Sequence, residues 1–152
     1  MNPMAMLTAV ERVLITLWVG GLWVVGYLAV PILFYTLDDR KLAGELAGRM
    51  FTTMNTVGLI CGVAILALMI GAARHAWFRS VRCWVVVAML VIVAASAFGL
   101  QPMMQELKAT GLLPGSAEAA QFGRLHGVSS ALYMVLSVLG LVLVIRGQAP
   151  KT

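Results

Sequence analysis

The chain has 152 residues, of which 61% are hydrophobic and 11% are charged, and its formal net charge at pH 7 is +5. Soluble domains are about half apolar and a quarter charged, so this composition excludes an ordinary water-soluble protein and indicates an integral membrane protein. The positive charge is then expected to reflect membrane topology and contact with anionic lipid, and it gives no support to nucleic-acid binding.

Four long apolar runs predict four membrane-spanning helices, at residues 13–37, 51–73, 83–105 and 123–146. Each run reaches roughly the 20 residues that a helix needs to cross about 30 Å of hydrocarbon. Helices are favoured over barrel strands because the runs lack an alternation of period two and a helix satisfies its own backbone hydrogen bonds. The predicted fold class is all-α: a single four-span domain over residues 1–152, folded as an integral membrane antiparallel four-helix bundle in contact with the lipid bilayer.

The first apolar run also occupies the place where a cleavable signal peptide would lie. It is longer than the apolar region of such a peptide, and it contains Trp18, Trp23 and Tyr27. No small-x-small cleavage site follows it before the charged stretch 38–41. We therefore expect a permanent membrane anchor.

Residues typical of turns and helix caps mark the two connections on the predicted outer side. Asp38 or Asp39 can cap a helix that begins before the second apolar run. Gly111 and the Pro114–Gly115 pair interrupt the chain after the third run, and Ser116 can cap a helix leading into the fourth. The second and fourth helices are thus expected to begin outside the hydrocarbon.

Basic residues give a weak indication of the orientation of the chain. Four spans place the two termini and the 74–82 loop on one side, which carries six Lys and Arg residues: Arg12, Arg74, Arg79, Arg82, Arg146 and Lys151. The other side carries five: Arg40, Lys41, Arg49, Lys108 and Arg124. Because cytoplasmic loops are enriched in Lys and Arg, we expect both termini in the cytoplasm.

Glycines at helical spacing predict where the helices pack closely. Small residues at a spacing of four let helix backbones approach in lipid, where no hydrophobic force drives association. The predicted packing positions are Gly20, Gly21, Gly58, Gly62, Gly123 and Gly127. The same faces are candidates for contact with a second copy of the chain, in a homodimer, or with a partner membrane protein.

Polar side chains gather near the predicted outer ends of the second, third and fourth spans. Ionisable groups near membrane depth are costly enough to suggest function, so they form a candidate ligand-binding cluster. The cluster consists of Arg49, Asn55, Gln101, Glu106, Arg124 and His126, continued along the fourth span by Ser130 and Tyr133.

One helical face of the fourth span carries part of this cluster. His126, Ser130, Tyr133 and Ser137 recur at intervals of four, three and four, so we expect them to face inward. The alternative is structural: Arg124 anchors at the interface or pairs with Glu106, and His126 accepts or donates a structural hydrogen bond.

Sulfur-containing residues supply a weaker indication of a metal site. Thioethers and an imidazole suit Cu(I), and the candidates are His126, Met50, Met54, Met103 and Met104, the last two following an expected break at Gln101–Pro102. Methionine is also a common filler of apolar cores, which is the competing interpretation. Cys61 and Cys83 have no ligand spacing and are expected to be small buried hydrophobic residues.

Several segments resemble one known family. They are LWVGGLWVVGYLAVPILF at 17–34, AGELAGRMF at 43–51, QPMMQEL at 101–107 and FGRLHGVSSALYMVLSVLGL at 122–141. Together they resemble the bacterial branch of the transmembrane-protein-205-like family, four-span proteins of unknown function. That family is distantly similar to copper-resistance-D and haem-biosynthesis membrane proteins. The resemblance implies the bacterial inner membrane as location, and copper or haem as candidate cofactors.

Two classes of function follow from these observations. The first is binding or transport of a small ligand or metal at the outer polar cluster. The second is a structural or accessory role, in which the cluster locks the helix ends and the glycine faces bind a partner. Catalysis is not expected, because the sequence shows no nucleophile beside a base, no carboxylate pair within a span and no dedicated metal motif.

Overall fold

The computed structural model describes residues 3–73 and 80–147, and within these residues the regular structure is helical. The loop residues Arg74 and Arg79 and the terminal Lys151, which entered the orientation argument, lie outside the described residues. The elements in chain order are α1 (Pro3–Val24), η1 (Val25–Ala29), α2 (Val30–Thr36), α3 (Arg40–Ala73), α4 (Val81–Ala95), η3 (Ser96–Leu100), α5 (Gln101–Ala109) and α6 (Ala117–Gly147).

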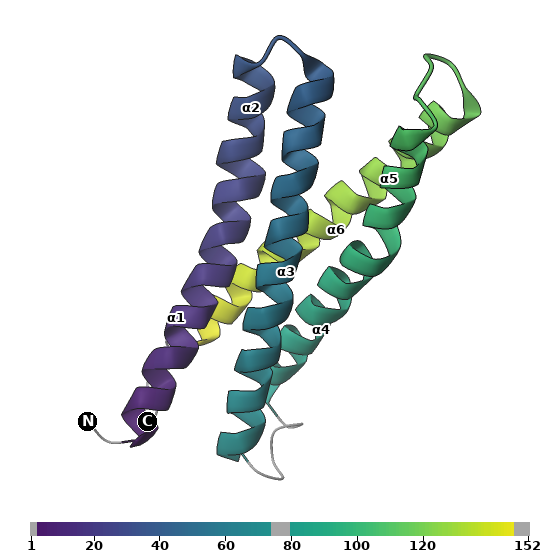
Figure 1. Cartoon of the computed structure of the whole chain (residues 1–152). Coiled ribbons are helices and arrows are strands. Elements are labelled where there is room, and N and C mark those ends of the chain that lie inside the picture. Colours follow the sequence, from purple (N-terminus) through teal and green to yellow (C-terminus); the bar gives the residue numbers. More distant parts are fainter. Residues whose placement is uncertain (1–2, 74–79, 148–152) are drawn as a thin grey trace.

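These elements form four long helical rods. α1, η1 and α2 are continuous, as are α4, η3 and α5, while α3 and α6 are single helices (Figure 1). The stretches 4–36, 40–71, 81–109 and 117–146 are each long and apolar enough to cross a membrane. The predicted all-α four-helix membrane bundle is confirmed, and the chain is a multi-pass membrane protein.

In cross-section the four rods lie at the corners of a square, each in contact with two neighbours. α1 contacts α3 and α6, and α4 contacts the same two helices from the opposite corner. The described ends of the chain lie at one end of the bundle, which we call the termini end (Figure 1). The other end, which carries the connections 37–39 and 110–116, is called the distal end. There, α5 and the first half of α6 lean away from α2 and the start of α3.

Helix starts at the distal end follow the predicted caps. The Asp39 carboxylate accepts hydrogen bonds from the backbone N–H groups of Lys41 and Leu42, at 2.8 and 3.1 Å. The Ser116 hydroxyl accepts one from the Ala119 backbone N–H at 3.1 Å. Gly111 and Gly115 have φ values of 83° and 82°, which side chains disfavour, so both turns depend on glycine. The predicted interruption of the helix by Gly111 and by the Pro114–Gly115 pair is therefore confirmed.

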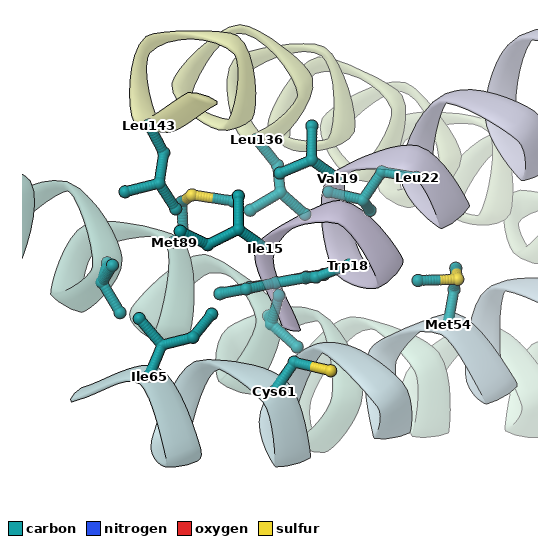
Figure 2. Packing of buried hydrophobic residues seen from close by; sticks show 12 residues of the cluster. Ile15, Trp18, Val19, Leu22, Met54, Cys61, Ile65, Met89, Leu136 and Leu143 are labelled. Atoms are coloured by element: carbon teal, nitrogen blue, oxygen red, sulfur yellow. The ribbon is translucent and has the colours of Figure 1, made fainter. Parts of the chain in front are cut away.

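The core is built around Trp18 of α1, which is fully buried (Figure 2). Ile65 of α3, Met89 of α4 and Leu143 of α6 are equally inaccessible and bring all four rods to this cluster. Because lipid is as apolar as these side chains, close packing and dispersion hold the rods together here, with no hydrophobic force between them.

Three of the predicted packing glycines lie at close helix contacts. A Cβ atom built on Gly58 would lie 2.7 Å from the Trp18 indole nitrogen, and one on Gly62 would lie 2.6 Å from Leu90. A Cβ on Gly21 would lie 2.8 Å from the Met54 methyl. At Gly58 and Gly62 the Trp18 ring leaves no space for a side chain, whereas at Gly21 the flexible end of Met54 could shift.

The other three predicted packing glycines do not serve that role within the chain. A Cβ atom on Gly20, Gly123 or Gly127 would meet nothing within 4 Å. The prediction was wrong for these positions because spacing alone does not fix which side of a helix faces a neighbour. In α6 the close glycine is Gly140, where a Cβ would lie 3.1 Å from Val19.

Prolines explain the two π-helical turns. The Val30 N–H donates to the Val25 carbonyl and the Gln101 N–H to the Ser96 carbonyl, each five residues back. Pro31 and Pro102 follow directly; a proline lacks an N–H and crowds the carbonyl four residues before it. A wider turn relieves that crowding within membrane helices. The expected break at Gln101–Pro102 is therefore absent: the helix continues to Ala109.

Candidate functional site

The predicted polar cluster lies in the distal half of the bundle, but it does not converge on one cavity. Arg124, His126 and Ser130 are exposed on α6. The Ser130 hydroxyl donates to the His126 carbonyl at 2.9 Å, and the His126 ring stacks on Phe122, with centroids 6.1 Å apart. The expectation that His126 and Ser130 face inward is thus wrong.

The lean of α6 accounts for this difference. Tyr133 and Ser137, on the same predicted face, are half-buried and buried respectively, so the helical phase was correctly predicted. Beyond Tyr133 the distal half of α6 packs on α5 and leans away from α2 (Figure 1). The helical face that is partly buried at Tyr133 is therefore exposed at Ser130 and His126, one and two turns nearer the distal end.

Tyr133 has a structural position between three rods. Its hydroxyl donates to the Leu22 carbonyl of α1 at 2.6 Å, and its ring packs edge-on against Phe51 of α3, with centroids 5.1 Å apart. A side chain on Gly26, within η1, would collide with the Tyr133 ring. Tyr133 therefore joins α6 to the widened turn of the first rod.

The ion pair between Arg124 and Glu106, one of the two structural alternatives for Arg124, does not form: both side chains are exposed, and no ion pair of either is present among the described residues. Lys108 instead connects the distal elements. Its ammonium donates to the Gly44 carbonyl of α3 at 3.4 Å and lies 5.6 Å from the centre of the Phe122 ring of α6. From the sequence, Lys108 was considered only as one of the basic residues that indicate the orientation of the chain in the membrane.

Arg49, Met50 and Met54 are the members of the predicted set that the fold brings together. They line an open hollow of about 360 Å³ at the distal end, between the first rod and α3. The lining is completed by Val25, Leu33, Leu46 and Thr53. The Thr53 hydroxyl donates to the Arg49 carbonyl at 3.0 Å, and Arg49 is the one charged residue among those that line the hollow.

The remaining predicted residues are distributed over separate surroundings. Asn55 and Met104 are buried, at 9% and 7% exposure, whereas Met103 is exposed and Gln101 is half-buried. None of these four lines the distal hollow. The predicted ligand set is therefore reduced to Arg49 with the two methionines of α3.

A copper site does not fit these residues. Met50 and Met54 supply thioethers, but the guanidinium of Arg49 lines the same hollow and repels a metal cation. His126, the one imidazole near this end, lies on the exposed face of α6 and does not line the hollow. Among the described residues, no group of three or more His, Cys, Asp or Glu side chains is placed to hold a metal ion. Cys61 and Cys83 are buried and unpaired, as predicted.

A second hollow lies at the termini end and was not predicted from the sequence. It has a volume of about 410 Å³ and is lined by α1, α4 and α6. Arg82 of α4 donates to the Glu11 carboxylate of α1 at 2.6 Å across it, with side chains 30% and 19% exposed. The signal was present in the charge pattern, because Glu11 is the single acidic residue on a side that carries six basic ones.

The four long apolar helices place the chain in the class of multi-pass α-helical membrane proteins. Within that class, the chain belongs to the family described as Domain of unknown function (DUF4149), whose sequence pattern matches residues 13–112. The matched range contains every residue that lines the distal hollow. No curated protein and no solved structure matches the chain. The likeness to the transmembrane-protein-205-like and copper-resistance-D groups stays a prediction.

Proposed function

We propose that this protein binds an amphiphile, a molecule with an apolar chain and an acidic headgroup, in the distal hollow. The observation that carries the proposal is Arg49, the one charged side chain in a hollow otherwise lined by apolar groups and Thr53. The volume, about 360 Å³, lies at the lower end of the range of small-molecule sites, roughly 300–1,000 Å³. This is a binding role without catalysis.

The two parts of such a ligand match the two parts of the hollow. The guanidinium of Arg49 can donate two parallel hydrogen bonds to a carboxylate or phosphate. Arg49 precedes the predicted start of the second span at residue 51, a level that suits lipid headgroups. The apolar chain would extend along Val25 and Met54 towards the membrane centre. Val25 opens the π-turn η1, and such turns are frequent at functional sites.

We further propose that the protein resides in the bacterial inner membrane with both termini in the cytoplasm. The support is the small excess of basic residues on the side of the termini, six against five. In this orientation the distal hollow opens towards the outer leaflet, and its ligand would come from that leaflet.

Binding of oleate and of oleyl alcohol to the purified full-length chain in detergent tests the proposal. The two probes share a chain and differ in the charged headgroup. Arg49→Gln should weaken oleate binding about tenfold, which corresponds to about 1.4 kcal/mol, and leave oleyl alcohol unchanged. Thr53→Phe, which fills the hollow, should weaken both probes.

Arg124→Gln is the matched control, because Arg124 is an exposed distal arginine that does not line the hollow. It should leave both probes unaffected. The proposal would be overturned if the Arg49→Gln and Thr53→Phe variants bound oleate as tightly as the parent does.

The accessory role is the second candidate. Its support is the open space at Gly123 and Gly127, on an exposed part of α6 that a second membrane helix could approach closely. Light scattering on the same preparations measures the state of assembly. A dimer that Gly127→Leu dissociates, together with no binding of oleate, would favour this role over the first.

A further inference from the structure

The hollow at the termini end combines charged and apolar walls. α1 contributes Glu11, Arg12 and two threonines, α4 contributes Arg82, and the apolar part consists of Ile15, Leu143 and Val144. The hydroxyls of Thr8 and Thr16 already donate to the carbonyls of Met4 and Arg12, both at 2.9 Å. The arginines are therefore the hydrogen-bond donors that this hollow offers to a ligand.

Arg82 is incompletely satisfied by its ion pair. One terminal nitrogen donates to Glu11, whereas its Nε is buried and has no hydrogen-bond partner among the described residues. Buried polar groups are nearly always hydrogen-bonded, so the unpaired Nε–H of a residue that lines the hollow indicates a missing acceptor nearby. Since Glu11 offsets one of the two arginines, the charge of the lining is +1, which suits one anionic group.

We propose that this second hollow binds a phosphate group, held by the guanidinium groups of Arg82 and Arg12. The phosphate of a phospholipid headgroup is the source that fits best, because Ile15, Leu143 and Val144 continue the site into the apolar part of the bundle. The site is separate from the distal hollow in place, residues and elements, and it stands whether or not the amphiphile proposal is correct.

Native mass spectrometry of the full-length chain, released from detergent with added lipid, tests this site. The probes are dioleoyl-phosphatidylglycerol and dioleoylglycerol, which carry the same chains with and without the phosphate. The parent should retain the phospholipid preferentially. Arg12→Gln should weaken its binding about tenfold, the loss expected for a charge-assisted hydrogen bond.

A double variant examines Arg82 without leaving a buried charge unpaired. Glu11→Gln combined with Arg82→Gln removes both partners of the ion pair and should also weaken phospholipid binding about tenfold. Arg146→Gln is the matched control, because Arg146 is an exposed arginine of α6 near the same end and does not line the hollow. It should leave binding unchanged.

Two further measurements complete the test. One distinguishes this site from the distal hollow, and the other distinguishes a lipid headgroup from free phosphate as the ligand. Thr53→Phe, which fills the distal hollow, should not change phospholipid retention here. Displacement of the lipid by excess inorganic phosphate would assign the site to free phosphate, and resistance to it would assign the site to the headgroup. Equal retention of the two lipids by the parent, or an equal loss with Arg146→Gln and Arg12→Gln, would overturn the proposal.

Discussion

Trp18 shows how a single residue determines the packing of neighbouring helices. Its ring occupies the space that Gly58 and Gly62 leave on α3, and Leu90 of α4 approaches Gly62 from the adjacent rod. The indole nitrogen is buried and has no hydrogen-bond partner among the described residues, so shape and dispersion rather than polar pairing fix the ring. The close contact at this point depends both on the absence of side chains at two positions of α3 and on one large side chain of α1.

Added methyl groups should therefore destabilise the bundle at some glycines and not at others. Gly58→Ala and Gly62→Ala place a Cβ against the rigid Trp18 ring, and overpacking of this kind costs roughly 1–3 kcal/mol. Gly20→Ala and Gly127→Ala add the same group in open space. The midpoint of thermal unfolding in detergent should fall for the first pair and stay near the parental value for the second. The same midpoint in all four variants would contradict the assigned packing.

For single residues, the sequence predicted which residue types are important better than it predicted what those residues contact. Spacing predicted Gly58 and Gly62, but Gly123 and Gly127 have the same spacing and face open space. The interval between two glycines fixes that they share a face, and only the neighbouring helices decide whether that face is covered. For the same reason Arg124 and His126 were grouped with Arg49 in one predicted site, although the fold separates them.

At the scale of helices, the two π-turns divide the first and third rods at similar places. Each turn immediately precedes a residue followed by proline, and the helix continues beyond it. Hydropathy and cap residues predicted the four helices and the starts near Asp39 and Ser116, because both signals are local. They did not predict the π-turns, because a proline alone does not specify whether a helix breaks, kinks or widens.

Tyr133 should stabilise the π-turn of the first rod. Tyr133→Phe keeps the ring against Phe51 but leaves the Leu22 carbonyl without its hydroxyl donor. Side-chain hydrogen bonds inside membrane proteins contribute about 1 kcal/mol, so the midpoint of thermal unfolding should fall. Tyr35→Phe is the control, because Tyr35 is 94% exposed. Equal midpoints for the two variants would show that the hydroxyl contributes nothing to stability.

At the scale of the whole molecule, the fold class was predictable because lipid permits few alternatives. Four runs of sufficient length must be helices, and short connections make neighbouring helices antiparallel. The lean of α5 and α6 at the distal end was not predictable, since the angle between helices depends on contacts of residues far apart in the sequence, such as that of Lys108 with Gly44. That lean opens the distal end, and it also explains why one predicted polar cluster became an isolated arginine beside an apolar hollow.

Orientation is the property of the whole molecule that decides which leaflet each hollow faces. A reporter active only in the cytoplasm should be active when fused after Thr152 and inactive when inserted in the 110–116 connection, because α6 alone separates these positions. The expected direction follows from the excess of basic residues at the termini end, six against five, which is a small bias. The reverse pattern would keep four spans and exchange the leaflets of the two hollows. Activity at both positions would show that α6 does not cross the membrane, and the four-span fold would then be wrong.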